Sequence, residues 1–210
     1  MSQWAGKSDE KVIKEALEVY VYTVLRGFYE QSREVAKGLF KETTGPDKAK
    51  FFKFPIFFNE KKFYKELLSA VLLNTHIIFI KGCENLNLDQ RLNIDEISVF
   101  GTRESLRDWG LAEGYKDDEL KKIWMGTRKY FEHASKVNKE PFDFAIAAVI
   151  AAMFVQELMP QPTIEQRKLA SLDVTFFLAR WGGGVTAGLN RLSELNYNIK
   201  LYLKDNQNKD

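Results

Sequence analysis

Residues 48–65 carry the most distinctive chemistry in this sequence. The segment reads KAKFFKFPIFFNEKKFYK, with six lysines, seven aromatic residues and one acid, Glu60. Its formal charge is therefore +5, whereas the whole chain carries only +2. Lysines attract phosphate groups and aromatic rings stack on unpaired bases, so the composition favours binding of single-stranded nucleic acid. The residues expected to make these contacts are Lys48, Lys50, Phe51, Lys53, Phe54, Phe57, Lys61, Lys62 and Lys65.

The same segment also suits a structural role. Phenylalanines usually lie in a protein core, and lysines beside them can cover apolar surface with their aliphatic stems. Phe63, Leu67 and Val71 share one face of a predicted helix, so Phe63 is expected to be buried. A basic aromatic surface also suits a membrane interface or an acidic partner. The sequence leaves these alternatives open.

Histidine and cysteine chemistry has few forms here, because His76, His133 and Cys83 are the only residues of those types. A single cysteine forms no intrachain disulfide. His76 and Cys83 lie seven residues apart, about 10.5 Å along a helix and too far to bind one ion. We therefore expect no metal site and no cofactor. His76 lies among apolar residues, so it is expected to be a core histidine.

A second feature with possible chemistry is Arg128-Lys129-Tyr130-Phe131-Glu132-His133, within a predicted helix. This stretch resembles the Arg-x(4–6)-His motif of HEPN ribonucleases, which are small helical domains of defence systems and toxins. The resemblance covers six of the 210 residues. It implies RNA cleavage without a metal, usually across a dimer interface. In such a site His133 would be the general acid–base and Arg128 would stabilise the phosphorane charge.

The spacing of these two residues constrains how they can meet. Positions five apart on a continuous helix point about 140° away from each other. Arg128 and His133 converge only if the helix starts or kinks between them, if Arg128 reaches around it, or if two subunits share the site. Otherwise they are surface residues that flank an apolar stripe.

The periodicity of apolar residues predicts a mostly helical chain. Residues 84–115 are the exception, where only a short helix capped by Thr102 and ending at Trp109 is expected. A run of three glycines, Gly182 to Gly184, is expected to form a joint between two helices. The other expected helices span residues 8–41, 60–81, 117–137, 141–159, 163–181 and from 185 into the 190s.

These elements indicate an all-α bundle of about six to eight helices. The alternative is an α+β fold, because the β-branched stretches 75–80 and 94–100 could pair as a small sheet. Residues 1–203 are expected to form one domain, followed by a polar tail at 204–210. The apolar run 144–155 is too short for a membrane span, which needs about twenty residues. We expect it to form a central core helix, and no membrane span in the chain.

The composition, 45% hydrophobic and 29% charged, is ordinary for a soluble protein, and the N-terminal residues lack a signal-peptide pattern. We therefore expect a cytoplasmic protein. The leading hypothesis is a nucleic-acid-associated binding protein, such as a subunit of a ribonucleoprotein or defence complex. One alternative is the HEPN-like ribonuclease. Another is a helical scaffold, homo-oligomer or small-ligand-binding protein with no nucleic-acid role.

Overall fold

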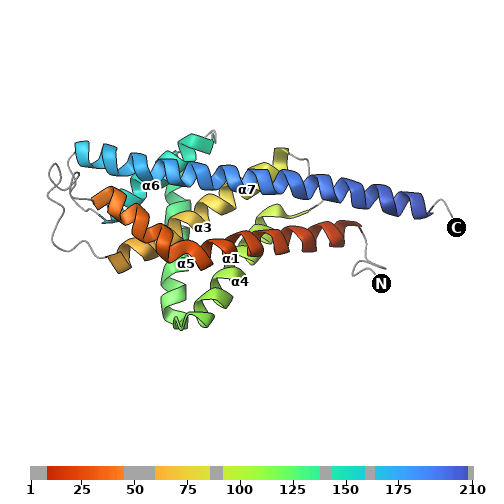
Figure 1. Cartoon of the computed structure of the whole chain (residues 1–210), viewed down its shortest axis with the longest axis horizontal. Coiled ribbons are helices and arrows are strands. Elements are labelled where there is room, and N and C mark those ends of the chain that lie inside the picture. Colours follow the sequence, from red (N-terminus) through yellow and green to blue (C-terminus); the bar gives the residue numbers. More distant parts are fainter. Residues whose placement is uncertain (1–8, 45–59, 86–91, 138–142, 159–163, 208–210) are drawn as a thin grey trace.

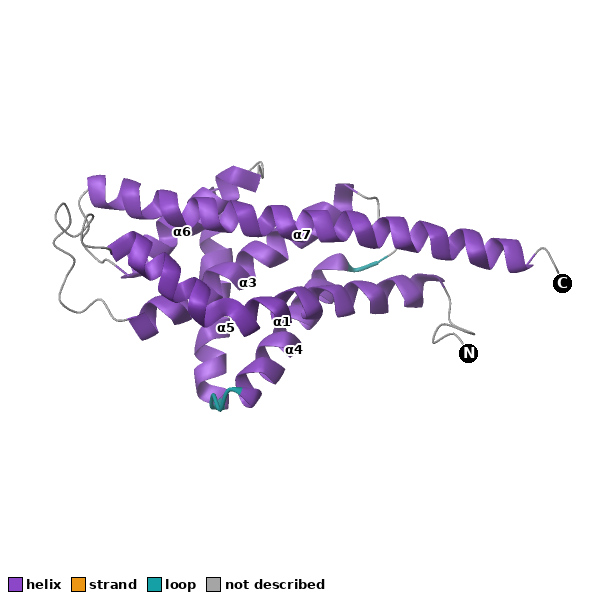
Figure 2. Cartoon of the chain, viewed as in Figure 1, coloured by secondary structure: helices purple, strands orange, loops and turns teal. Residues whose placement is uncertain are grey.

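The computed structural model describes residues 9–44, 60–85, 92–137, 143–158 and 164–207. Within these ranges the chain forms six helices and no strand, which confirms the all-α prediction (Figure 2). The stretches 75–80 and 94–100 are helical, so the α+β alternative is wrong. The helices are α1 (Asp9–Thr44), α3 (Glu60–Asn85), α4 (Ile94–Ala112), α5 (Asp117–Val137), α6 (Asp143–Leu158) and α7 (Ile164–Gln207).

Helix α3 lies at the centre of the bundle and packs against each of the other helices (Figure 1). Every residue from Leu67 to Leu73 is buried, as its all-round apolar sequence predicts, and so is Cys83 near the helix end. Among the described helices, α3 alone is long and apolar enough to cross a membrane. The rest of the protein buries 78% of the window that meets this criterion, which is what a core helix requires.

The polar side chains of α3 are directed at its neighbours. Each buried polar group needs a partner, so such hydrogen bonds fix where two helices meet along their length. The partners belong to α1, α4, α5 and α7. The bonds are Tyr64 Oη with Ser32 Oγ (2.8 Å), His76 Nδ1 with Ser98 Oγ (2.8 Å), Ser69 Oγ to Ile123 O (3.0 Å), Asn74 Nδ2 to Leu178 O (2.9 Å) and Trp181 Nε1 to Thr75 Oγ1 (2.8 Å).

The two longest helices, α1 and α7, run antiparallel along the bundle, so the start of α1 and the end of α7 lie on the same side (Figure 1). The bounds of α1 agree with the predicted helix 8–41 to within three residues. Tyr20 on α1 donates a hydrogen bond to the carbonyl of Val185 on α7. The apolar run at 144–155 forms most of α6, where Ile150, Ala151 and Phe154 are buried. The expected core helix is therefore present.

The predicted joint at Gly182–Gly184 is wrong, because α7 continues through all three glycines to Gln207. Packing explains why the helix does not break. Gly182 is buried against α3, where a Cβ would lie 3.2 Å from Ile78, and Trp181 is held by its bond to Thr75. The helix also includes the first four residues of the predicted polar tail, 204–207.

Helix α4 begins eight residues before the predicted cap at Thr102, which is itself buried within the helix. The N-cap is Asn93, whose side chain accepts a hydrogen bond from the amide of Glu96 (3.2 Å). Buried residues of α4 recur every three to four positions, but five of the nine are serine, threonine or glycine, and these separate the large apolar residues near the start of the helix from those near its end. The apolar stripe that sequence patterns detect is therefore interrupted in the middle of this helix. The buried residues are Ile94, Ile97, Ser98, Gly101, Thr102, Ser105, Leu106, Trp109 and Gly110.

Replacing either of two glycines of α7 by alanine is expected to change the stability of the protein, in opposite directions. A Cβ on Gly183 would meet no atom within 4 Å, whereas one on Gly188 would lie 2.9 Å from Tyr20 Cε2. We expect Gly183→Ala to stabilise the protein by roughly 0.5–1 kcal/mol, because alanine loses less entropy in a helix. Gly188→Ala should destabilise it by roughly 1–3 kcal/mol, because Tyr20 must move. Urea unfolding followed by circular dichroism measures both, and equal effects would contradict this packing.

Candidate functional site

Most of the predicted nucleic-acid contacts lie outside the described residues, namely Lys48, Lys50, Phe51, Lys53, Phe54 and Phe57. The remaining three lysines lie in the first two turns of α3. Lys62 is exposed and donates to the carbonyl of Glu157 (3.1 Å), and Lys65 pairs with Glu119 (3.3 Å). Phe63 is 1% exposed, which confirms that it belongs to the core. At this end of the segment the ring and the lysine heads therefore point in different directions.

The two residues of the HEPN-like motif both lie on α5, five positions apart on one continuous helix. Arg128 is exposed, and its Nε donates to Glu132 (3.2 Å), one turn further along the same helix. The side chain of His133 lies outside the described part of the structure. Cleavage by this pair therefore remains a prediction. Arg128 also lines a cavity.

This cavity, of about 180 Å³, lies between α3, α4 and α5. Its walls are mainly apolar, with one aromatic ring, and a few polar groups are interspersed among them. Pockets with this composition commonly bind small molecules. The lining residues are Leu72, Leu73, His76, Asp95, Val99, Thr102, Trp124, Thr127 and Arg128.

His76 is the most constrained polar group in this cavity. Its Nδ1 lies 2.8 Å from Ser98 Oγ and its Nε2 lies 3.3 Å from Asp95 Oδ1. A carboxylate can only accept a hydrogen bond, so Nε2 carries the proton when the ring is neutral. Nδ1 is then the acceptor, and the Ser98 hydroxyl donates to it. The imidazole is therefore fixed in one orientation and one tautomer.

The environment of His76 favours the neutral ring. Burial disfavours the charged form and outweighs the attraction of Asp95, so the pKa of His76 lies below its ordinary value of 6.5. Ring and carboxylate therefore form a hydrogen bond between a neutral donor and an anion at pH 7. Asp95 remains a charged group at the cavity, with its side chain 68% exposed.

The order Asp95, His76, Ser98 contains the three residue types of a hydrolase triad, but Ser98 cannot act as a nucleophile. Its side chain is fully buried, and it lies behind the imidazole outside the lining of the cavity. In a hydrolase triad the serine is accessible and the carboxylate is buried, whereas here the carboxylate is exposed and the serine is buried. We therefore interpret Ser98 as the group that orients His76 from within the core.

The cavity also combines opposite charges with an unused hydroxyl. Asp95 supplies an anion and Arg128 a cation, and both side chains line the same space. Thr102 is 1% exposed, and its hydroxyl has no hydrogen-bond partner within the described structure. Thr127 is also buried but is satisfied by the carbonyl of Ile123 (3.1 Å). A bound molecule could therefore meet apolar walls, one cation and one anion at once.

No family model, curated protein or solved structure matches this chain. Among the described residues there is also no group of three or more His, Cys, Asp or Glu side chains placed to hold a metal ion. The function is therefore inferred from the geometry of the molecule itself.

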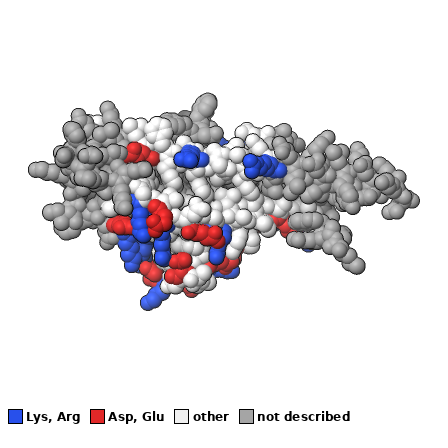
Figure 3. Space-filling view, in the orientation of Figure 1, with Lys and Arg blue, Asp and Glu red and all other residues white. Residues whose placement is uncertain are grey.

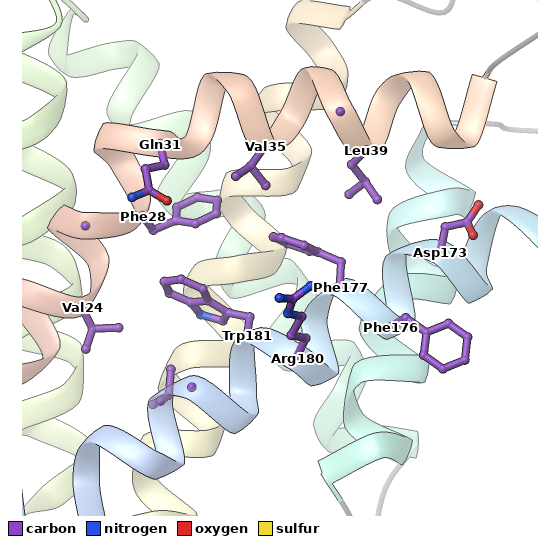
Figure 4. A pocket seen from close by; sticks show the side chains of 14 residues that line it. Val24, Phe28, Gln31, Val35, Leu39, Asp173, Phe176, Phe177, Arg180 and Trp181 are labelled. Carbon is purple, nitrogen blue, oxygen red and sulfur yellow. The ribbon is translucent and has the colours of Figure 1, made fainter. Parts of the chain in front are cut away.

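A second concavity is an open groove of about 870 Å³ between α1 and α7 (Figure 4). Asp173, which interrupts an apolar stretch of the sequence, lines this groove together with Arg180. Its environment is thus the side of a groove and not the interior of the core. Figure 3 shows basic and acidic side chains next to one another, mainly in the lower part of the described face.

The low pKa of His76 predicts a loss of stability in mild acid. Below pH 6.5 the unfolded chain binds a proton at this histidine that the folded protein resists, so the free energy of unfolding decreases as pH falls. The slope for one such group is at most about 1.4 kcal/mol per pH unit. Urea unfolding between pH 7.5 and 5.5 measures it.

His76→Gln should remove this slope, whereas His133→Gln, at the only other histidine, serves as the matched control. Carboxyl groups titrate mainly below this range, so they contribute little to the difference. An identical slope in wild type and His76→Gln would show that His76 is not the titrating group.

Proposed function

We propose that this protein binds a small zwitterionic molecule with an apolar body, of the type of a free amino acid with an apolar side chain, in the cavity between α3, α4 and α5. One observation carries the proposal: a single apolar cavity is lined by both a carboxylate, Asp95, and a guanidinium, Arg128. An ammonium group suits the first and a carboxylate group suits the second.

The size of the cavity limits the apolar part of the ligand. An apolar cavity of about 150 Å³ is known to hold a benzene molecule. The space of about 180 Å³ here therefore suits one six-membered ring or a branched chain of similar size. Leu72, Leu73 and Val99 supply aliphatic contacts, and Trp124 offers the edge or face of an indole.

Both charged residues can bind a ligand without losing their present contacts. Arg128 bonds Glu132 through Nε, and a guanidinium has four further N–H donors on its terminal nitrogens. Asp95 bonds His76 through Oδ1, and a carboxylate has a second oxygen. Neutral His76 keeps Asp95 in place without cancelling its charge, which preserves the anion for an ammonium group.

The proposal predicts that L-phenylalanine binds and that both of its charges are needed. We expect 3-phenylpropanoate, which lacks the ammonium group, and 2-phenylethylamine, which lacks the carboxylate, to bind at least tenfold more weakly. A hydrogen bond to a charged group contributes about 1.5–3 kcal/mol, and 1.4 kcal/mol corresponds to a factor of ten. Calorimetric titration of the purified protein with each probe measures the difference.

Three variants connect that binding to the cavity. Arg128→Met and Asp95→Asn should each weaken L-phenylalanine binding about tenfold or more, and asparagine still offers an oxygen to His76 Nε2. Arg103→Met, at an exposed position of α4 outside the cavity lining, should have no effect. If L-leucine, L-phenylalanine and their single-charge analogues all fail to bind at millimolar concentration, the proposal is wrong.

A second candidate is the nucleic-acid-associated role of residues 48–65. The observation in its favour is that Lys61 and Lys62 expose their heads at the start of α3 while Phe63 turns into the core. Basic groups at this end are thus accessible to a phosphate backbone.

This role predicts salt-dependent binding of single-stranded RNA. Mutating Lys50, Lys53, Lys61 and Lys62 together to glutamine should weaken binding and flatten its dependence on salt, because fewer counterions are released. Fluorescence anisotropy in EDTA measures both, and quadruple substitution of Lys11, Lys14, Lys121 and Lys122 is the control. Unchanged affinity in the first variant would exclude the segment. Degradation of the RNA that disappears when His133 is substituted would support the ribonuclease alternative.

A further inference from the structure

Several aromatic residues line the groove between α1 and α7 (Figure 4). Phe176 is 62% exposed at one side, and Phe177 and Trp181 are half-buried along the floor. Val24 and Val35 continue the apolar lining on the α1 side. Contiguous apolar surface of this kind commonly marks a site where another molecule binds.

Glycines line the same groove on both helices. A Cβ on Gly27, Gly38 or Gly184 would meet no atom within 4 Å, whereas one on Gly82 would lie 2.6 Å from Leu189 Cδ1. Packing within the chain therefore explains the small residue at Gly82 but not at the three groove positions. Glycine lowers the stability of a helix. At an open position of the helix surface, no contact within one copy of the chain requires so small a residue. A second helix that approaches the groove closely would provide such a contact.

The charges along α7 indicate which helix this is. Asp173 and Arg180 lie seven residues apart, two turns along the same side of α7, and both line the groove. In an antiparallel pair of α7 helices centred between Phe176 and Phe177, Asp173 of each copy faces Arg180 of the other. Two pairs of opposite charge then form by symmetry. In a parallel pair each of these residues would instead face its own counterpart, with like charges together.

We propose that two copies of this chain associate through the α1/α7 groove, about a two-fold axis that passes between Phe176 and Phe177. Because α1 and α7 are antiparallel within one copy, two such pairs placed face to face form a four-helix bundle. The same surface is used on both copies, as two-fold symmetry requires. The dimer does not depend on the ligand site, since the cavity lies between α3, α4 and α5.

The experiment uses full-length protein and measures mass by light scattering during size-exclusion chromatography and dissociation by sedimentation velocity. The wild type should reach twice the chain mass of 24.3 kDa as concentration rises. Asp173→Lys and Arg180→Glu each place like charges opposite one another, so each should raise the dimer dissociation constant at least tenfold. Asp118→Lys and Arg103→Glu, at exposed positions outside the groove, should leave it unchanged.

Mixing the two groove variants tests the antiparallel geometry. In a mixed dimer the lysine introduced at position 173 of one copy faces the glutamate introduced at position 180 of the other. The unchanged Arg180 of the first copy then faces the unchanged Asp173 of the second. We expect two variants that are monomeric alone to associate with near wild-type affinity when mixed. Circular dichroism establishes that each variant is folded before mixing.

A monomeric wild type at millimolar concentration would overturn the proposal, and a groove that binds another protein's helix would then be the remaining interpretation. Dimers that persist in both charge variants would place the interface elsewhere. Weakened single variants that do not rescue one another would overturn the antiparallel arrangement.

Discussion

The structure depends on the hydrogen bonds that α3 directs outward from the centre of the bundle. A helix that is apolar on all sides can rotate and slide against its neighbours at little cost, since one apolar contact replaces another. Tyr64, Ser69, Asn74, Thr75 and His76 remove that freedom, because each polar group would lose its partner if its neighbour shifted by a turn. An unsatisfied buried polar group costs roughly 1–3 kcal/mol, so four helices are fixed to one axis by a few contacts.

The cavity follows from the same arrangement. His76 bonds Ser98 on α4 and thereby holds α3 and α4 in one register, while Ser69 fixes α5 through the carbonyl of Ile123. The space between these three helices therefore has walls that cannot easily close on it. The core contact and the proposed ligand contact share one residue, because the imidazole that Ser98 orients also holds Asp95 at the cavity. The structural contact of His76 and its proposed contribution to ligand binding thus use the two different nitrogens of one imidazole ring.

Sequence patterns predict the helices whose buried face is apolar and miss those whose buried face is not. Helices α1, α3 and α5 are predictable because leucine, valine and aromatic residues recur at helical spacing. Helix α4 is not, because Ser98, Gly101, Thr102 and Ser105 occupy its buried side and β-branched residues occur near its start. At Gly182 local propensity predicts a break, and contact with α3 overrides it. The sequence draws attention to Arg128 through its spacing from His133. Its oppositely charged neighbour in the cavity, Asp95, and the residues of α3 that line the cavity come from other helices, so no local spacing links them to Arg128.

Cys83 can serve as a chemical probe of how often the helix bundle opens. The thiol is fully buried near the end of α3, next to Gly82, which packs against Leu189 of α7. A reagent that modifies thiols therefore has no route to the sulfur until α3 separates from the helices around it. Because the chain has one cysteine, the rate of labelling measures how often α3 separates from its neighbours. Anything that holds the bundle closed should slow that chemistry without touching the cysteine itself.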